Sequence, residues 1–198
     1  MANSSECIRK SFHTMLTQAE IDLEMWLAMR EARRSDDIVL MLNRGYGRFY
    51  MAAENALFNS LITILYAVFE RRSGTANFWK LKETLREDAD PSVLRDLETD
   101  YTAIKQKWKR IEGIRNEVVS HQTLKRTVAE SHKIAGMTLD DIEGMVRSCQ
   151  ELLFRIASVF YDTHVVFNLK GADSFNKLIP DLRSIKSTIP NPLRVSNN

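Results

Sequence analysis

An arginine and a histidine near the end of one helical stretch are the residues of this chain best suited to chemistry. Arg115 is followed directly by Asn116, and His121 lies six positions after Arg115. A guanidinium is a permanent cation with donors arranged to grip an anion, and an imidazole exchanges a proton near neutral pH. Segment 115–121 is therefore the first candidate for a functional site.

Arg115 also occupies a place in the helical pattern where an apolar side chain is expected. The apolar positions before it recur at alternating steps of three and four, at Leu94, Leu97, Tyr101, Ile104, Trp108 and Ile111. The next two places in this stripe are Arg115 and Val118. An inward guanidinium needs a partner or a task, because desolvating it unpaired costs on the order of several kcal/mol. Glu54, a charge on another mostly apolar stripe, is the expected partner in a buried ion pair.

The charge of the chain is uneven around this segment. The formal net charge is only +2, which gives no general attraction to nucleic acid. Residues 103–133, however, carry eight Lys or Arg against three Glu. A solvated helix face and an electropositive site both account for this excess, and the sequence leaves both open.

Composition indicates one soluble globular domain. The chain has 198 residues, of which 44% are hydrophobic and 27% charged. Residues 1–6 lack the pattern of a secretory signal, so a cytoplasmic location is expected. The most apolar run, 56–69, is too short to span a bilayer. Two cysteines show no zinc or disulfide spacing, and the aspartate pairs at 36–37 and 140–141 each begin a helix, so neither a metal nor a cofactor is expected.

Helical periodicity recurs along the chain, and no segment alternates as a strand hairpin does, so the fold is expected to be all-α. The expected helices cover about 6–33, 49–72, 78–85, 91–121 and 138–167. Asp90-Pro91 and the capping box Thr138 to Asp141 mark two of their starts. The last helix carries a sustained apolar seam, Ile142 to Phe167, which indicates tight helix packing.

The sequence divides into a helical domain over residues 1–170 and a C-terminal segment over residues 171–198. That segment contains three prolines, few aromatic residues and an Asn-rich end. These features predict a loosely docked tail.

An all-α chain with Arg-Asn and then His near the end of a long helix resembles the HEPN superfamily, and within it the phage abortive-infection proteins. Active members have an Arg and a His with four to six residues between them, often with Asn, Asp or His directly after the Arg. Here five residues separate Arg115 from His121, and Asn116 follows the Arg. The resemblance covers about residues 6–167 and implies an antiparallel bundle of four to six helices.

This resemblance implies metal-independent RNA cleavage at a cleft between two subunits. His121 would transfer a proton at the 2′-hydroxyl or the leaving oxygen, and Arg115 would stabilise charge on the phosphoryl oxygens. Asn116 would orient the site, and Glu54 would support it. Some active members carry a Tyr shortly after the His, whereas this chain has Gln122-Thr123-Leu124 there. The resemblance thus implies an RNA substrate, a homodimer, and a role in stress response, toxin–antitoxin systems or phage defence, with an antitoxin or nucleotidyltransferase as a further partner.

Helix geometry limits how Arg115 and His121 can act on one target. On an ideal helix Arg115 and His121 are about 120° apart, so one straight helix does not aim both at one target. Two copies, or a helix that loosens near Ser120, remove this difficulty. Two other functions stay open: a catalytically silent HEPN module that binds RNA, a nucleotide or a protein, and a plain helical interaction protein. Arg115 and His121 would then only complement a helix dipole.

Overall fold

The structure of the protein is a computed structural model that describes residues 2–72, 74–86, 89–116, 136–167 and 170–185. These residues contain helices and no strand, which confirms the all-α prediction. The elements in chain order are α1 Ala2–Ala32, α2 Asp36–Met41, the π-helical turn η1 Leu42–Tyr46, α3 Gly47–Phe69, α4 Phe78–Leu85, α5 Pro91–Ile114, α7 Leu139–Tyr161 and α8 Gly171–Ile185.

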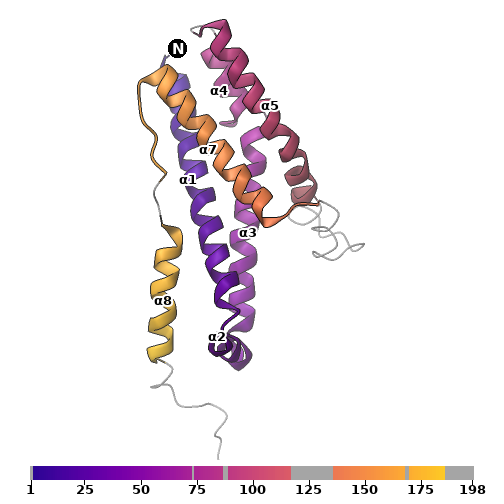
Figure 1. Ribbon diagram of the computed structural model, residues 1–198, viewed down its shortest axis with the longest axis vertical. Helices are drawn as coiled ribbons and strands as arrows, with labels where there is room; N and C mark the ends of the chain where they lie inside the picture. The colour runs from indigo at the N-terminus through magenta and orange to yellow at the C-terminus, as the bar shows by residue number, and fades with distance from the viewer. Residues whose placement is uncertain (1, 73, 87–88, 117–135, 168–169, 186–198) are drawn as a thin grey trace, which may run out of the picture.

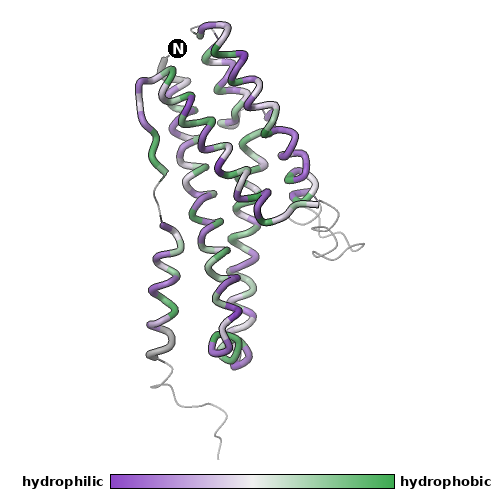
Figure 2. Tube along the Cα trace, in the orientation of Figure 1, coloured by the Kyte–Doolittle hydropathy of each residue, from purple (hydrophilic) through white to green (hydrophobic). Residues whose placement is uncertain are grey.

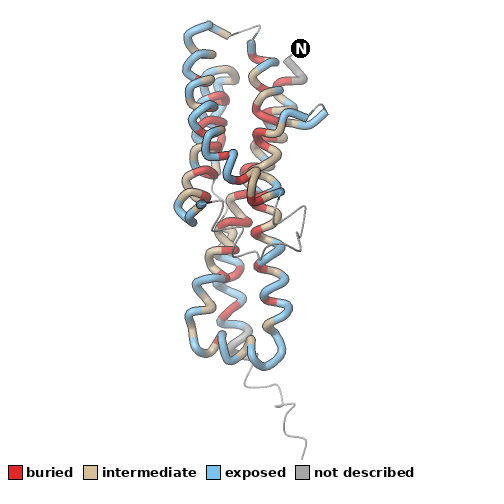
Figure 3. The backbone as a smooth tube through the Cα atoms, turned by 90° about the vertical axis from the view of Figure 1, so that its right-hand side faces the viewer, coloured by how far each residue is buried: buried red, intermediate tan, exposed pale blue. Residues whose placement is uncertain are grey.

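The long helices α1 and α3 lie side by side in opposite directions, and α5 and α7 cover their upper part in Figure 1. Apolar and polar residues alternate along each helix at helical spacing, as Figure 2 shows. The buried positions follow the inner faces of the bundle (Figure 3). Helix α1 buries one face, whose side chains are spaced by three or four residues: Phe12, Leu16, Ala19, Leu23 and Trp26.

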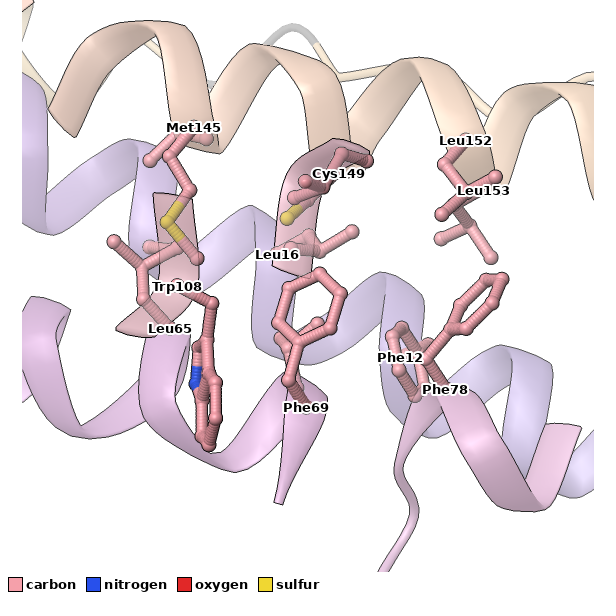
Figure 4. Close-up of a cluster of buried hydrophobic side chains, with 14 of the residues drawn as sticks. Phe12, Leu16, Leu65, Phe69, Phe78, Trp108, Met145, Cys149, Leu152 and Leu153 are labelled. Atoms are coloured by element: carbon pink, nitrogen blue, oxygen red, sulfur yellow. The ribbon is translucent and has the colours of Figure 1, made fainter. Parts of the chain in front are cut away.

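The centre of the bundle is an apolar core that joins all the long helices. Figure 4 shows Met145 and Cys149 of α7 above Leu16 of α1, with Trp108 of α5 and Phe69 of α3 beneath them. Burial raises the pKa of the Cys149 thiol to about 12, so this thiol stays protonated and behaves as a small apolar group. The buried side chains of this core, Cys149 included, therefore stabilise the fold.

Helix α7 begins where the sequence predicts and ends earlier. The hydroxyl of Thr138 accepts a hydrogen bond from the Asp141 amide, and the Asp141 carboxylate accepts one from the Thr138 amide, which confirms the capping box. The predicted seam to Phe167 is wrong in its last turn and a half. Asp162 adopts a left-handed conformation with φ 43°, so the helix stops at Tyr161.

Residues 171–185 form helix α8, where the sequence analysis expected a loosely docked tail. Phe175 and Ile179 are one turn apart and buried, and they give α8 an apolar face that packs on α1. Gly171 lies so close to α1 that an added Cβ would meet the Ile21 carbonyl oxygen at 2.9 Å. Pro180 lies inside this helix without ending it. The sequence did not predict this helix, because the three prolines outweighed a short amphipathic pattern.

The turn before α3 is shaped by a glycine. Gly45 has φ 119°, a conformation that favours glycine, and it separates α2 from α3 within a nearly continuous helical stretch. By length and composition alone, the helical stretch Asp36–Phe69 is long and apolar enough to cross a membrane, and part of it is buried inside the structure. This stretch contains α3, whose inner face forms the core.

Candidate functional site

The C-terminal end of α5 carries Arg115 beside its buried face. That face consists of Leu97, Tyr101, Ile104, Trp108, Ile111 and Ile114. Ile114, and not Arg115, therefore takes the inward place after Ile111, because a step of three residues keeps the stripe on the same side of the helix. Arg115 is half-buried at the edge of the stripe, so the prediction of a fully inward arginine is corrected.

Arg115 lies over an aromatic ring that the sequence analysis did not single out. Its guanidinium carbon is 4.6 Å from the ring centroid of Tyr66 in α3, which is a cation–π contact. Its Nη1 donates a hydrogen bond of 3.0 Å to the side-chain oxygen of Asn116, which is exposed. The structure thus brings Arg115 and Asn116 together at the surface and fixes the arginine against α3.

The Tyr66 ring is itself held by α5. Tyr66 stacks on Trp108 with 5.5 Å between ring centroids and an angle of 27°, and the Trp108 indole N–H donates to the Tyr66 carbonyl oxygen at 3.2 Å. The Tyr66 hydroxyl donates a long hydrogen bond of 3.4 Å to Glu70. Burial raises the pKa of the Tyr66 phenol, the charge of Glu70 adds to this, and the cation of Arg115 opposes it. Tyr66 is therefore a neutral platform at neutral pH.

The helix changes its winding at the candidate site. Arg115 and Asn116 continue α5 in a π-helical conformation. Such turns are wider than α-helical ones, and single π-helical turns inside α-helices are frequently found at functional sites. The ideal α-helical spacing assumed for Arg115 and His121 therefore does not apply at Arg115 and Asn116 themselves.

His121 lies outside the described residues, as do the other residues of 117–135. This range also contains part of the basic segment that the sequence analysis identified. The grouping of His121 with Arg115 therefore remains a prediction from the sequence.

Glu54 is buried, as predicted, but its partner is not Arg115. Its carboxylate accepts a hydrogen bond of 2.9 Å from Arg33, which follows α1. Tyr66, where Arg115 meets α3, is twelve residues further along that helix, or about 18 Å along its axis. The predicted Glu54–Arg115 pair is wrong because the two helices bring Arg115 to a different turn of α3.

Tyr66 was missed because nothing in its sequence context is unusual. It stands directly after the buried Leu65 on a helix rich in apolar residues. Its one distinguishing property, an aromatic ring with a polar tip beside an apolar stripe, is shared by many half-buried tyrosines. Only the packing of α5 on α3 reveals that it supports Arg115.

Metal ligands do not cluster in the part of the chain that the structure describes. Within it, no three His, Cys, Asp or Glu side chains gather in a way that could hold an ion. Asp141 at the start of α7 caps its own helix, and hydrogen bonds from Thr138 lower the pKa of Asp141. Metal-independent chemistry remains a prediction.

The comparison with protein families identifies the chain, whereas searches of curated proteins and of solved structures gave no match. The family model HEPN_AbiU2, described as AbiU2, matches residues 6–183. The match covers most of the chain and includes the Arg115-Asn116 segment, His121 and most of α8. The resemblance to HEPN abortive-infection proteins is thereby confirmed, and this all-α chain belongs to the AbiU2 family of HEPN proteins.

Proposed function

We propose that this protein is a metal-independent endoribonuclease of the HEPN type that acts in bacterial stress response or phage defence. One observation supports this proposal most directly. Arg115, the arginine of the HEPN motif, is held on the Tyr66 ring while its side chain stays half-exposed beside the exposed Asn116. A guanidinium placed in this way is available to an anionic substrate.

In the proposed reaction, the 2′-hydroxyl oxygen of the RNA attacks the adjacent phosphorus, and the bond to the 5′-oxygen of the next nucleotide breaks. His121 transfers the proton lost by the 2′-hydroxyl or the proton gained by the leaving oxygen. Arg115 stabilises the negative charge that develops on the phosphoryl oxygens, and Asn116 orients the guanidinium through their hydrogen bond. The products carry a 2′,3′-cyclic phosphate and a 5′-hydroxyl.

We further propose that the site is completed by a second copy of the chain. Two proton transfers need an acid and a base, and a cleft between two subunits supplies a His121 from each of them. RNA, a second copy and a neutralising antitoxin or nucleotidyltransferase are the proposed partners, and the proposed location is the cytoplasm. Light scattering at micromolar concentration should report a dimer. A monomer would contradict the shared cleft.

The test of the activity is cleavage of single-stranded RNA in EDTA. Arg115→Ala and His121→Ala should each lower the cleavage rate about 100-fold or more, because charge stabilisation and acid–base catalysis are each worth at least that much. Circular dichroism should show unchanged helical content. Matched controls are Arg48→Ala and His164→Ala, which remove an exposed arginine and an exposed histidine outside the site.

The outcome also decides between the proposed enzyme and a binding module. Cleavage that needs Mg²⁺, or that survives both site substitutions, would contradict the mechanism. Failure of the wild-type protein to cleave, combined with RNA binding that depends on Arg115, would favour the catalytically silent HEPN module.

A further inference from the structure

We propose that Tyr66 is a positioning residue for Arg115, which it holds through the face of its ring in the orientation that RNA cleavage needs. This inference rests on the endoribonuclease function proposed above. Tyr66 belongs to α3 and stands almost fifty residues before the HEPN motif, so it lies outside that motif altogether. It does not touch the reacting atoms in this proposal and acts only through the guanidinium.

The ring is held firmly enough to place a side chain. Trp108 stacks on it at 5.5 Å between centroids, and the Trp108 indole N–H is hydrogen bonded to the Tyr66 carbonyl oxygen. Trp108 itself is buried in the core and belongs to α5, seven residues before Arg115. The α3–α5 interface therefore sets the position of the ring and of the arginine backbone together.

An aromatic ring holds an arginine differently from a carboxylate. A carboxylate occupies the N–H donors along the guanidinium edge and neutralises the charge. A ring contacts the guanidinium face and leaves the edge donors and the full positive charge to the substrate. In this site the neutral Asn116 side chain accepts one hydrogen bond from Nη1 of Arg115. Tyr66 and Asn116 thus orient Arg115 without competing for its charge.

The same contact reduces the freedom of a long side chain before substrate arrives. Arginine has several rotatable bonds, and a catalytic group that is fixed in advance needs less ordering in the transition state. Loss of the ring should therefore lower the rate of the chemical step more than it weakens RNA binding.

The experiment compares Tyr66→Leu, which removes the ring, with Tyr66→Phe, which keeps the ring and removes the hydroxyl that contacts Glu70. Tyr66→Leu should lower kcat about tenfold while KM stays within about threefold. Tyr66→Phe should stay within about twofold of the wild-type protein in both constants, because the ring face is retained. Tyr66→Met replaces the Leu variant if that variant does not fold.

A matched control removes a similar ring elsewhere. Trp79 of α4 lies under Arg71, with 4.0 Å between the guanidinium carbon and the ring centroid. Trp79→Leu should leave kcat and KM within about twofold, because the cation–π contact that it breaks lies outside the site. Equal defects in Tyr66→Leu and Trp79→Leu would overturn the inference, as would a Tyr66→Phe variant as defective as Tyr66→Leu.

A spectroscopic readout separates this inference from the proposed function. In protein with labelled arginine side chains, the Nε–H signal of Arg115, assigned by its absence in Arg115→Lys, should show the ring-current shift of a group above an aromatic face. The shift should persist in Tyr66→Phe and disappear in Tyr66→Leu. An unchanged signal in Tyr66→Leu would overturn the positioning role.

The cleavage assay and the spectra together show whether the positioning role of Tyr66 or the proposed endoribonuclease function is wrong. A wild-type protein that cleaves RNA alongside an equally active Tyr66→Leu variant would overturn the positioning role and leave the endoribonuclease intact. A wild-type protein that does not cleave RNA would overturn the proposed function and the role of Tyr66 in it. The ring-current shift would then still show whether the ring holds Arg115.

Discussion

Two arginines meet helix α3 at different turns, and the helix holds them in different ways. Arg33 donates to the carboxylate of Glu54 at 2.9 Å, and the side chain of Glu54 is only 9% exposed. Arg115 lies over the neutral ring of Tyr66 and donates to the amide of Asn116. The first arrangement compensates the charge of a buried carboxylate. The second fixes a guanidinium without a charged partner in either contact.

This difference separates a structural arginine from a candidate catalytic one. A buried carboxylate without its partner is costly, so the Arg33–Glu54 pair answers a requirement of folding. Neither the Tyr66 ring nor the Asn116 amide needs a cation to be stable where it lies. Under the proposed function, the contacts of Arg115 hold its charge toward an anionic substrate.

The largest expected effect is the contrast between the two arginines in RNA cleavage. Arg115→Ala should lower the rate about 100-fold or more, because the phosphoryl charge loses its stabilising cation. Arg33→Ala should leave the rate per folded molecule within about twofold, since its charge is compensated by Glu54. Rates measured in EDTA, corrected for the folded fraction by circular dichroism, test the contrast. Similar losses in the two variants would remove the distinction between them.

The free energy of unfolding should depend on the buried Arg33–Glu54 pair. Glu54→Ala should lower the free energy of unfolding by about 2 kcal/mol, because it leaves Arg33 partly desolvated and empties a buried site. Urea unfolding measures this change. Glu31→Ala is the matched control: it breaks the exposed Arg34–Glu31 pair, whose side chains are 78% and 69% exposed, and should cost less than about 0.5 kcal/mol. Equal small changes would mean that the Arg33–Glu54 pair contributes nothing to stability.

Asn116 is the second group that holds Arg115, through a side-chain hydrogen bond. Asn116→Ala removes the hydrogen bond to Nη1 and leaves the Tyr66 contact in place. The cleavage rate should fall about fivefold, which corresponds to one hydrogen bond of about 1 kcal/mol. Thermal melting should be unchanged because Asn116 is exposed. A rate equal to that of the wild-type protein would show that the ring alone orients the guanidinium.

The smallest expected effect is the change in stability on substituting Tyr50, which lies near the Arg33–Glu54 pair. The Tyr50 hydroxyl donates a buried hydrogen bond of 2.6 Å to the Met29 carbonyl, so Tyr50→Phe should cost about 1 kcal/mol of stability below pH 9. Burial raises the pKa of Tyr50 from 10.0 to about 12, and the charge of Glu54 adds to the rise. Between these two values the folded protein keeps a proton that the unfolded chain releases, so stability falls as pH rises.

Tyr50→Phe lacks this group, so its stability should approach that of the wild-type protein as pH rises above about 10 and exceed it near pH 12. Urea unfolding of both proteins at several pH values measures the difference. A difference that stays constant over this range would show that the pKa of Tyr50 is not raised by folding.

Local patterns in the sequence determined the elements of this protein. The steps of three and four predicted the buried face of α5, and the capping residues Asp90 and Thr138 predicted two helix starts, because periodicity and capping depend on residues within one or two turns. The arginine and asparagine of the HEPN motif were also visible, since they are neighbours in the chain. The burial of Glu54 followed from its place among apolar residues.

Contacts between helices were decided only by the tertiary structure. Which carboxylate meets which arginine depends on how far one helix is shifted along another, and a periodic pattern is unchanged by a shift of whole turns. The sequence therefore predicted that Glu54 is buried but not that Arg33 pairs with it, and it predicted a special role for Arg115 but not the Tyr66 ring beneath it. The docking of α8 likewise depended on the close approach of Gly171 to α1, which no local pattern encodes.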